Sequence, residues 1–168
     1  MSRVKPMAME GLMFKSAIGI DHTPSEVASA IVEFMKVDSN RNYVVTIGTD
    51  SELYNKTSAD FVTAIVVHRV GNGARYFWRR MKFDNFHTIR DRILQEVLTS
   101  LDTAKFVLAE LKAMHSPEFK FEIHVDVGEN GETKTMIQEL VGIIRANDFE
   151  ARTKPESYAA SSVADRHV

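Results

Sequence analysis

The sequence contains no cysteine in its 168 residues. This absence excludes disulfide bonds, thiolate catalysis and metal sites with cysteine ligands, so any bound metal must be held by oxygen or imidazole. No apolar run approaches the roughly 18 to 20 residues needed to span a bilayer, and no signal-like apolar stretch follows the first residues. We therefore expect a cytoplasmic protein with no membrane or disulfide partner.

A large excess of charge of either sign is also lacking, because 21 Lys and Arg face 23 Asp and Glu. A protein that coats nucleic acid by bulk electrostatics would be strongly basic. Basic residues do gather between His68 and Arg92, where they outnumber two acidic ones: Arg69, Arg75, Arg79, Arg80, Lys82, Arg90 and Arg92. This run is compatible with a phosphate-facing patch and equally with a solvated sheet edge.

The chain has the composition of a globular protein, with 44% hydrophobic and 26% charged residues, and its length suits one domain. Residues 1–22 show no clear period, which indicates a partly ordered arm. Thr23-Pro24-Ser25-Glu26 has the pattern of a helix N-terminus and predicts an accessory helix that ends near Val37. We expect an N-terminal arm and helix over 1–42 and the main domain over 43–168.

The main domain is predicted to be an α/β fold with a mixed five-stranded sheet flanked by helices. Hydrophobic patterning predicts strands over 43–49, 61–70, 74–82, 119–127 and 149–154, and helices over 86–114, 133–146 and from 158 onward. The first three strands are joined by short turns and should be antiparallel. The strands separated by helices should be parallel, through right-handed crossovers.

Two aspartates follow predicted strands of this sheet. Asp50 comes after the strand 43–49, and Asp126 ends the strand 119–127. Taken alone, each aspartate is of a type that is common in the turns that follow strands. Together they would lie side by side, because the carboxyl ends of parallel strands meet at one rim, where open sheets bind their ligands. Two close carboxylates repel unless a cation lies between them, which makes a divalent ion such as Mg²⁺ the expected occupant.

Further carboxylates are available on the predicted helices. Glu96 lies on one flank of the apolar stripe of the helix 86–114, and Asp91 lies on the opposite flank as its competitor. Either one is also compatible with a solvent-facing position. Asp165, near the end of the chain, is a fourth candidate, although by spacing alone it is no more than a tail charge.

Three segments carry a resemblance to a known family: Ile47-Gly48-Thr49-Asp50-Ser51, His124-Val125-Asp126-Val127-Gly128, and Ser-Tyr-Ala-Ala-Ser-Ser-Val-Ala-Asp over 157–165. With the order of elements, they resemble the ribonuclease H-like superfamily and, within it, a YkuK-type bacterial branch. The resemblance covers roughly residues 43–168. It implies a nuclease acting on RNA, DNA or a hybrid by a two-metal-ion mechanism. It implies Asp50, Glu96, Asp126 and Asp165 as catalytic ligands of Mg²⁺ or Mn²⁺, with Asp91 still open as the helix ligand.

Other residues are candidates for substrate binding or proton transfer. His167 follows Asp165 by two residues and could move a proton or simply be solvated. Lys134, at the start of the helix 133–146, could hold a phosphate. Ser51 and Arg80 are also candidate substrate contacts. The remaining candidates are ambiguous: Tyr76 and Trp78 suit base stacking or core packing, and His124 is expected to be a packed core histidine.

Three other functions compete with the nuclease. The main alternative is a catalytically inert ribonuclease H-like module that binds nucleic acid or protein, since fold does not establish activity. An ATP-binding phosphotransferase of the actin and sugar-kinase type would need two such domains around a cleft. A zinc hydrolase is disfavoured because the sequence has no His-Glu-x-x-His spacing.

Overall fold

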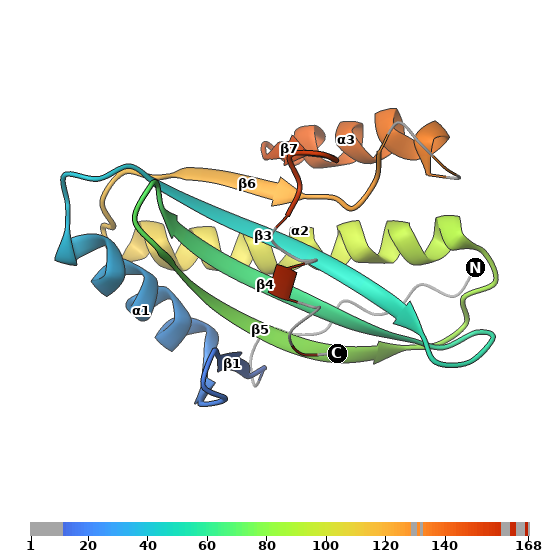
Figure 1. Cartoon of the computed structure of the whole chain (residues 1–168), viewed down its shortest axis with the longest axis horizontal. Coiled ribbons are helices and arrows are strands. Elements are labelled where there is room, and N and C mark those ends of the chain that lie inside the picture. The colour runs from blue at the N-terminus through green and yellow to red at the C-terminus, as the bar shows by residue number, and fades with distance from the viewer. Residues whose placement is uncertain (1–11, 129–130, 132, 159–161, 164–166, 168) are drawn as a thin grey trace.

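The structure is a computed structural model that describes residues 12–128, 131, 133–158, 162–163 and 167. Within these residues a seven-stranded mixed sheet has the order β2-β1-β5-β4-β3-β6-β7 (Figure 1). The strands are β1 (Phe14–Ser16), β2 (Asp21–His22), β3 (Tyr43–Leu53), β4 (Ala59–Arg69), β5 (Ala74–Phe83), β6 (Lys120–His124) and β7 (Glu150–Arg152). The helices are α1 (Pro24–Val37), α2 (Ile89–Ala113) and α3 (Ile137–Ala146), with a 3₁₀ helix η1 (Lys134–Met136) before α3.

The predicted α/β class and the mixed sheet are confirmed. β3, β4 and β5 form an antiparallel meander, while β6 pairs parallel with β3, and β7 pairs parallel with β6. The predicted count of five strands was too low, because β1 and β2 extend the sheet beyond β5. These two strands are too short to show a period in the sequence, but Phe14 anchors them by fully burying its side chain.

Local signals explain where the helices begin. Thr23 and Glu26 form a reciprocal capping box at the start of α1, and Thr88 caps α2, so that helix begins at Ile89 rather than at 86. The predicted helix over 133–146 is divided between η1 and α3. Of the predicted helix after 158, residues 162, 163 and 167 are helical and most of the others lie outside the described residues.

The two faces of the sheet are covered differently. One face packs against the helices in a single core that includes Val45 and Ile47 of β3, Ile31 of α1 and Leu101 of α2. On the opposite face, Val163 packs on Ala64 and Val66 of β4, while in Figure 1 α2 runs behind the sheet. In the described part of the chain, no helix combines the length and apolar character required to cross a bilayer.

Candidate metal site

Asp50 lies within β3 rather than after it, because β3 continues to pair with β4 as far as Leu53. The predicted end of this strand at residue 49 was therefore too early. Asp50 lies opposite Val62 of β4, and its Oδ1 accepts a hydrogen bond from the backbone N–H of Ser51 at 3.0 Å. Side chains alternate along a strand, so Asp50 lies on the face away from α2, while Thr49 and Ser51 face that helix.

Asp126 reaches the level of Asp50 through the parallel pairing of β3 with β6. The pairing ends with Gly48 opposite His124, and each aspartate lies two residues further along its chain. The electrostatics agree with this register, because the charge of Lys154 interacts with both carboxylates. Both aspartates thus lie within electrostatic range of the same lysine at this edge of the sheet.

Glu96 reaches this edge from α2, where hydroxyl groups of β3 hold the helix in register. Ser51 Oγ donates to Glu96 Oε1 at 2.5 Å, and one helical turn later Ser100 Oγ lies 2.8 Å from Thr49 Oγ1. Thr63 Oγ1 of β4 lies 2.9 Å from the same Thr49 oxygen. Buried hydroxyl groups need partners, and sliding α2 along the sheet would break these contacts together. The network therefore determines where Glu96 lies.

The carboxyl group of Glu96 is buried, with 6% of the residue exposed. Burial raises its pKa to about 8; the hydrogen bond from Ser51 and the charge of Arg92 oppose the shift, while the charges of Asp50 and Asp126 add to it. All three carboxyl groups therefore lie within electrostatic range of one another. A divalent cation would relieve both the mutual repulsion and the cost of ionising a buried acid.

Asp91, the alternative helix residue, lies at the beginning of α2. Its backbone N–H donates to Thr88 Oγ1 at 3.1 Å. A carboxylate in the first turn stabilises a helix through the helix dipole, which gives Asp91 a structural role. Glu96 lies five residues further along the helix, about 7.5 Å at 1.5 Å per residue. Of the two, Glu96 is the one that contacts β3.

Lys154 is a residue of this site that the sequence did not indicate. Its Nζ lies 2.9 Å from Asp126 Oδ1, and this contact, with a smaller contribution from Asp50, raises the pKa of the lysine. Two features bring it there: its backbone N–H donates to Val127 O at 2.8 Å, and a Cβ on Gly128 would lie 3.1 Å from Lys154 Cβ. Both contacts depend on the pairing of β7 with β6, so no local sequence motif could have predicted them.

We expect Lys154→Met to tighten Mg²⁺ binding by no more than about fivefold. Lys154 supplies a positive charge that competes for Asp126, but its side chain is 57% exposed, and exposed ion pairs contribute roughly 0 to 1 kcal/mol. Isothermal titration calorimetry of the wild type and the variant measures the change. Lys120→Met, an exposed lysine at the opposite end of β6, is the matched control. Weaker Mg²⁺ binding by Lys154→Met would show that Lys154 does not compete with the metal ion for Asp126.

Two other predicted residues, Arg80 and His167, lie together at β5, two strands away from Asp50. Arg80 Nη2 donates to the backbone oxygen of His167, and the His167 ring stacks on Trp78. His167 was considered as a proton-transfer group beside Asp165. The structure instead places its ring on β5, and Asp165 lies outside the described residues.

The remaining candidates have separate surroundings. Lys134 is exposed and is the first residue of η1, which continues directly into α3, so it opens this helical segment as predicted. His124 is 4% exposed, and its Nδ1 accepts a hydrogen bond from the backbone N–H of Tyr158 at 3.2 Å. The interpretation of His124 as a packed core residue is confirmed.

The basic run between His68 and Arg92 does not form one patch. Arg69 lies with its guanidinium carbon 4.0 Å from the centre of the Phe34 ring, and Arg90 pairs with Glu139. Side chains alternate along β5, so Arg75 and Arg79 share the face of Phe77, which belongs to the main core beneath the helices. Arg80 and Lys82 share the opposite face with Tyr76 and Trp78, which pack with Val163. The phosphate-facing hypothesis is thereby limited to Arg80 and Lys82 on β5 and to Arg92, whose Nη1 donates to the backbone oxygen of Ser51 at 3.2 Å.

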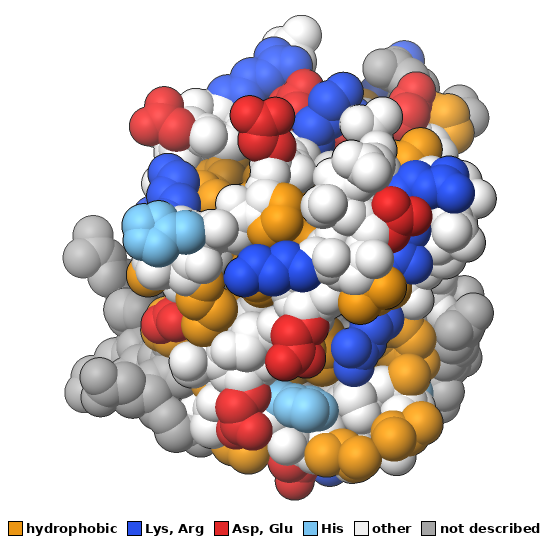
Figure 2. All heavy atoms as spheres, turned by 90° about the vertical axis from the view of Figure 1, so that its left-hand side faces the viewer, with side chains coloured by type: hydrophobic (Ala, Val, Ile, Leu, Met, Phe, Trp, Pro, Cys, Tyr) orange, Lys and Arg blue, Asp and Glu red, His pale blue; other side chains and the backbone are white. Residues whose placement is uncertain are grey.

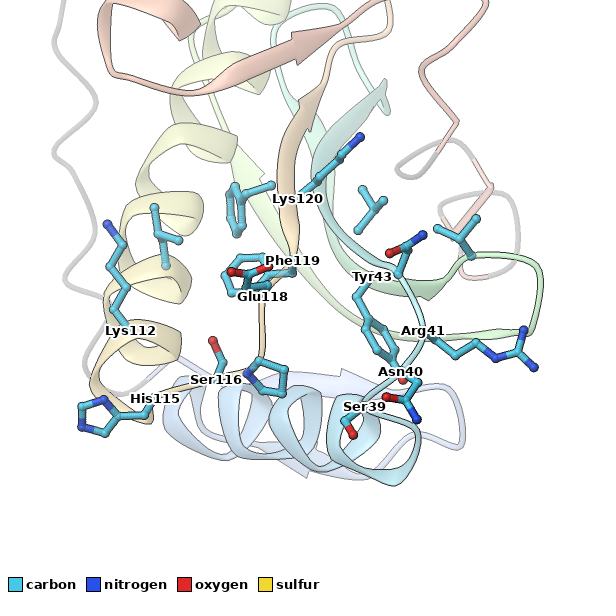
Figure 3. A pocket seen from close by; sticks show the side chains of 16 residues that line it. Ser39, Asn40, Arg41, Tyr43, Lys112, His115, Ser116, Glu118, Phe119 and Lys120 are labelled. Atoms are coloured by element: carbon cyan, nitrogen blue, oxygen red, sulfur yellow. The ribbon is translucent and has the colours of Figure 1, made fainter.

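A surface hollow of about 1220 Å³ lies at the far end of the sheet, at the beginnings of β3 and β6 (Figure 3). The residues 39–44 line one side, and His115 and Phe119 are among those on the other. Figure 2 shows this end of the molecule with basic and acidic side chains interspersed. Asp50, Asp91, Glu96 and Asp126 do not line the hollow, so it is separate from the site at Asp50.

Over the described ranges of the chain, no three acidic or histidine side chains are gathered closely enough to hold a metal ion in the arrangement seen. In this arrangement the carboxyl group of Glu96 accepts a hydrogen bond from Ser51, and that of Asp126 pairs with Lys154. The donor set nevertheless fits Mg²⁺ or Mn²⁺, which prefer anionic oxygen, and the buried Glu96 is a carboxyl group whose ionised form needs a cation.

Comparison with known proteins identifies the family. The sequence profile described as Ribonuclease H-like matches residues 26–168, so the chain belongs to the ribonuclease H-like family. It is 32% identical over 168 residues to a protein of Bacillus subtilis (strain 168) named "Uncharacterized protein YkuK", covering 94% of this chain and 97% of that protein. The predicted resemblance to the YkuK-type branch is confirmed. No solved structure gave a significant match.

Proposed function

We propose that this protein is a divalent-metal-dependent nuclease that hydrolyses phosphodiester bonds of nucleic acid by a two-metal-ion mechanism. The observation that carries the proposal is that the charges of Asp50 and Asp126 both act on the buried carboxyl group of Glu96, near the end of β3. Membership of the ribonuclease H-like family supports nucleic acid as the substrate. The family profile extends to residue 168 and therefore includes Asp165, which we propose as a fourth ligand.

The chain's own residues have distinct parts in this proposal. Asp50, Glu96 and Asp126 would hold Mg²⁺ or Mn²⁺, and Ser51 keeps the Glu96 carboxyl group directed toward the end of β3. When bound, such ions activate water and stabilise the leaving oxygen in an in-line displacement, so no nucleophilic side chain is required. Lys154 is a cation already beside Asp126, and it can counter negative charge there.

The direct test is a panel of labelled single-stranded and double-stranded RNA, DNA and hybrid substrates, incubated with Mg²⁺, with Mn²⁺ or with EDTA. We expect cleavage that depends on the added metal and disappears in EDTA. Equal cleavage with and without EDTA would overturn the proposal, because the proposed mechanism relies on bound metal ions to activate the water.

A catalytically inert binding module is the second candidate. It is favoured by one observation, the ion pair between Lys154 and Asp126, which supplies an internal cation to the acidic edge. Metal titration separates the two functions, since the module has no need of a divalent ion. If the protein binds nucleic acid but takes up no Mg²⁺ or Mn²⁺ in calorimetry, the module is the correct description.

A further inference from the structure

Three residues on one face of β5 all contact the same residue near the end of the chain. Tyr76, Trp78 and Arg80 alternate along the strand and so share a face. The rings of Trp78 and His167 are stacked, with centroids 4.2 Å apart and planes 15° from parallel. Tyr76 Oη lies 3.0 Å from His167 Nε2, and Arg80 Nη2 donates to the backbone oxygen of His167.

These contacts are of the kinds that a nucleotide receives from a protein. A flat heteroaromatic ring lies on an indole, as a base does on an aromatic side chain. A hydroxyl group meets a ring nitrogen at the edge, and a guanidinium contacts an oxygen, as it would contact a phosphate. The ring of His167 therefore lies where a base would stack, and its backbone oxygen lies where a phosphate oxygen would contact Arg80.

The surface formed by Tyr76, Trp78 and Arg80 shares a sheet face with Asp50. Arg80 lies opposite Val62, and Val62 lies opposite Asp50, so these three residues form one row across β5, β4 and β3. Two strand spacings separate the ends of this row, about 10 Å. Lys82, also exposed, is the next residue on the same face of β5. Val62, in the middle of this row, is buried, so a strand of nucleic acid would reach from Arg80 to the carboxylates only when Val62 is uncovered.

With His167 stacked on Trp78, one polar group of this surface has no hydrogen-bond partner among the described residues. Trp78 Nε1 is buried, and no hydrogen-bond acceptor for it occurs among the residues that the structure describes. A buried donor without an acceptor is destabilising. A nucleotide offers acceptor oxygens that an imidazole ring in this position does not.

We propose that Tyr76, Trp78 and Arg80 form a binding surface for single-stranded nucleic acid, on which a base stacks against Trp78 in the place taken by His167. A single strand is required because the faces of paired bases are already stacked within a duplex. The inference rests on the proposed function for its placement, since it assigns a substrate form to the site at Asp50. It remains testable when no cleavage occurs.

Trp78 is the only tryptophan in the sequence, so its fluorescence reports directly on this surface. The experiment titrates the full chain, in EDTA and at low salt, with short oligothymidylate, with oligouridylate and with a DNA duplex of the same length. Fluorescence anisotropy of labelled oligonucleotides gives the affinities, and tryptophan emission shows whether Trp78 is contacted. We expect both single strands to bind with a change in emission, and the duplex to bind several-fold more weakly.

Variants separate stacking from general electrostatics. Trp78→Leu keeps apolar bulk and should weaken single-strand binding roughly 5- to 100-fold, the range for loss of one stacked base. Arg80→Gln should weaken binding and lower its salt dependence, whereas Arg41→Gln, an exposed arginine on the turn before β3, should leave it unchanged. His167→Ala should tighten binding several-fold, because the surface is then uncovered.

Melting temperatures show whether each variant is folded, and Arg80→Gln provides a test at an exposed position if Trp78→Leu unfolds. Unchanged affinity in Arg80→Gln together with unchanged or weaker affinity in His167→Ala would overturn the inference, and His167 would then simply dock the end of the chain. Equal binding of the duplex would also overturn it. These outcomes are distinguishable from failure of the nuclease proposal, because Mg²⁺-dependent cleavage can persist without Trp78-dependent binding, and the reverse.

Discussion

Replacing Asp50 by Asn is expected to slow Mg²⁺-dependent cleavage by roughly a thousandfold or more. Asn has the same shape and can still accept the hydrogen bond from the backbone N–H of Ser51, so a purely structural Asp50 would tolerate the change. A metal ligand would not, because the substitution removes an anionic oxygen that Mg²⁺ prefers. Several kcal/mol of lost transition-state stabilisation correspond to this factor at about 1.4 kcal/mol per tenfold change in rate.

The measurement pairs cleavage rates with thermal melting in EDTA. Without metal, Asp50→Asn should melt at the wild-type temperature or higher, because repulsion between the charges of Asp50 and Asp126 is relieved. Asp91→Asn is the matched control, since it changes the alternative carboxylate on α2. It should keep most of the activity. Cleavage that survives in Asp50→Asn and falls in Asp91→Asn would show that the site is assigned to the wrong residues.

The metal-free protein is expected to lose stability as the pH rises from about 5 to 8, and Glu96→Gln should abolish most of that loss. The folded-state pKa of Glu96 is about 8, above its ordinary value. Between the two values the folded chain holds a proton that the unfolded chain has released, so the free energy of unfolding falls with rising pH. The change across this window is of the order of 3 kcal/mol, or roughly 10 °C in melting temperature for a chain of this size.

Melting curves in EDTA at a series of pH values, for the wild type and Glu96→Gln, measure this effect. Glu110→Gln is the control, since Glu110 lies on the same helix but is half-buried. It should retain the wild-type pH dependence. If the two variants show the same pH dependence, the carboxyl group of Glu96 is not the titrating group, and its raised pKa would no longer support a cation-binding site there.

Much of the fold could be predicted because its elements carry strong local signals. β3 and β4 are long β-branched runs, and α2 repeats apolar residues with the helical period through Val97, Leu101 and Leu111, all of which are buried. The boundaries were less certain, because pairing across the sheet decides where a strand ends. β3 extends past Asp50 only because β4 continues to pair with it. β1 and β2 depend on their neighbours in the same way.

The candidate site was predicted in part, for the same reason. Asp50 and Asp126 stand at recognisable places relative to strands, and Glu96 stands on the flank of a helix. Their sequence positions therefore limit where they can lie. The hydrogen bonds that hold Glu96, from Ser51 directly and from Thr49 through Ser100, join residues about 45 to 51 positions apart. No pattern in a single sequence reports such a pairing.

The sequence by itself determined the α/β class, the order of the main elements and the chemical type of the site, since these follow from periodicity, turn residues and the absence of cysteine. Only the tertiary structure decided which charges meet. Lys154 lies beside Asp126, and Arg80 lies level with Asp50, because strands distant in the sequence pair in one register. Electrostatic and stacking interactions act over a few ångströms, so their partners are determined by the fold rather than by sequence spacing.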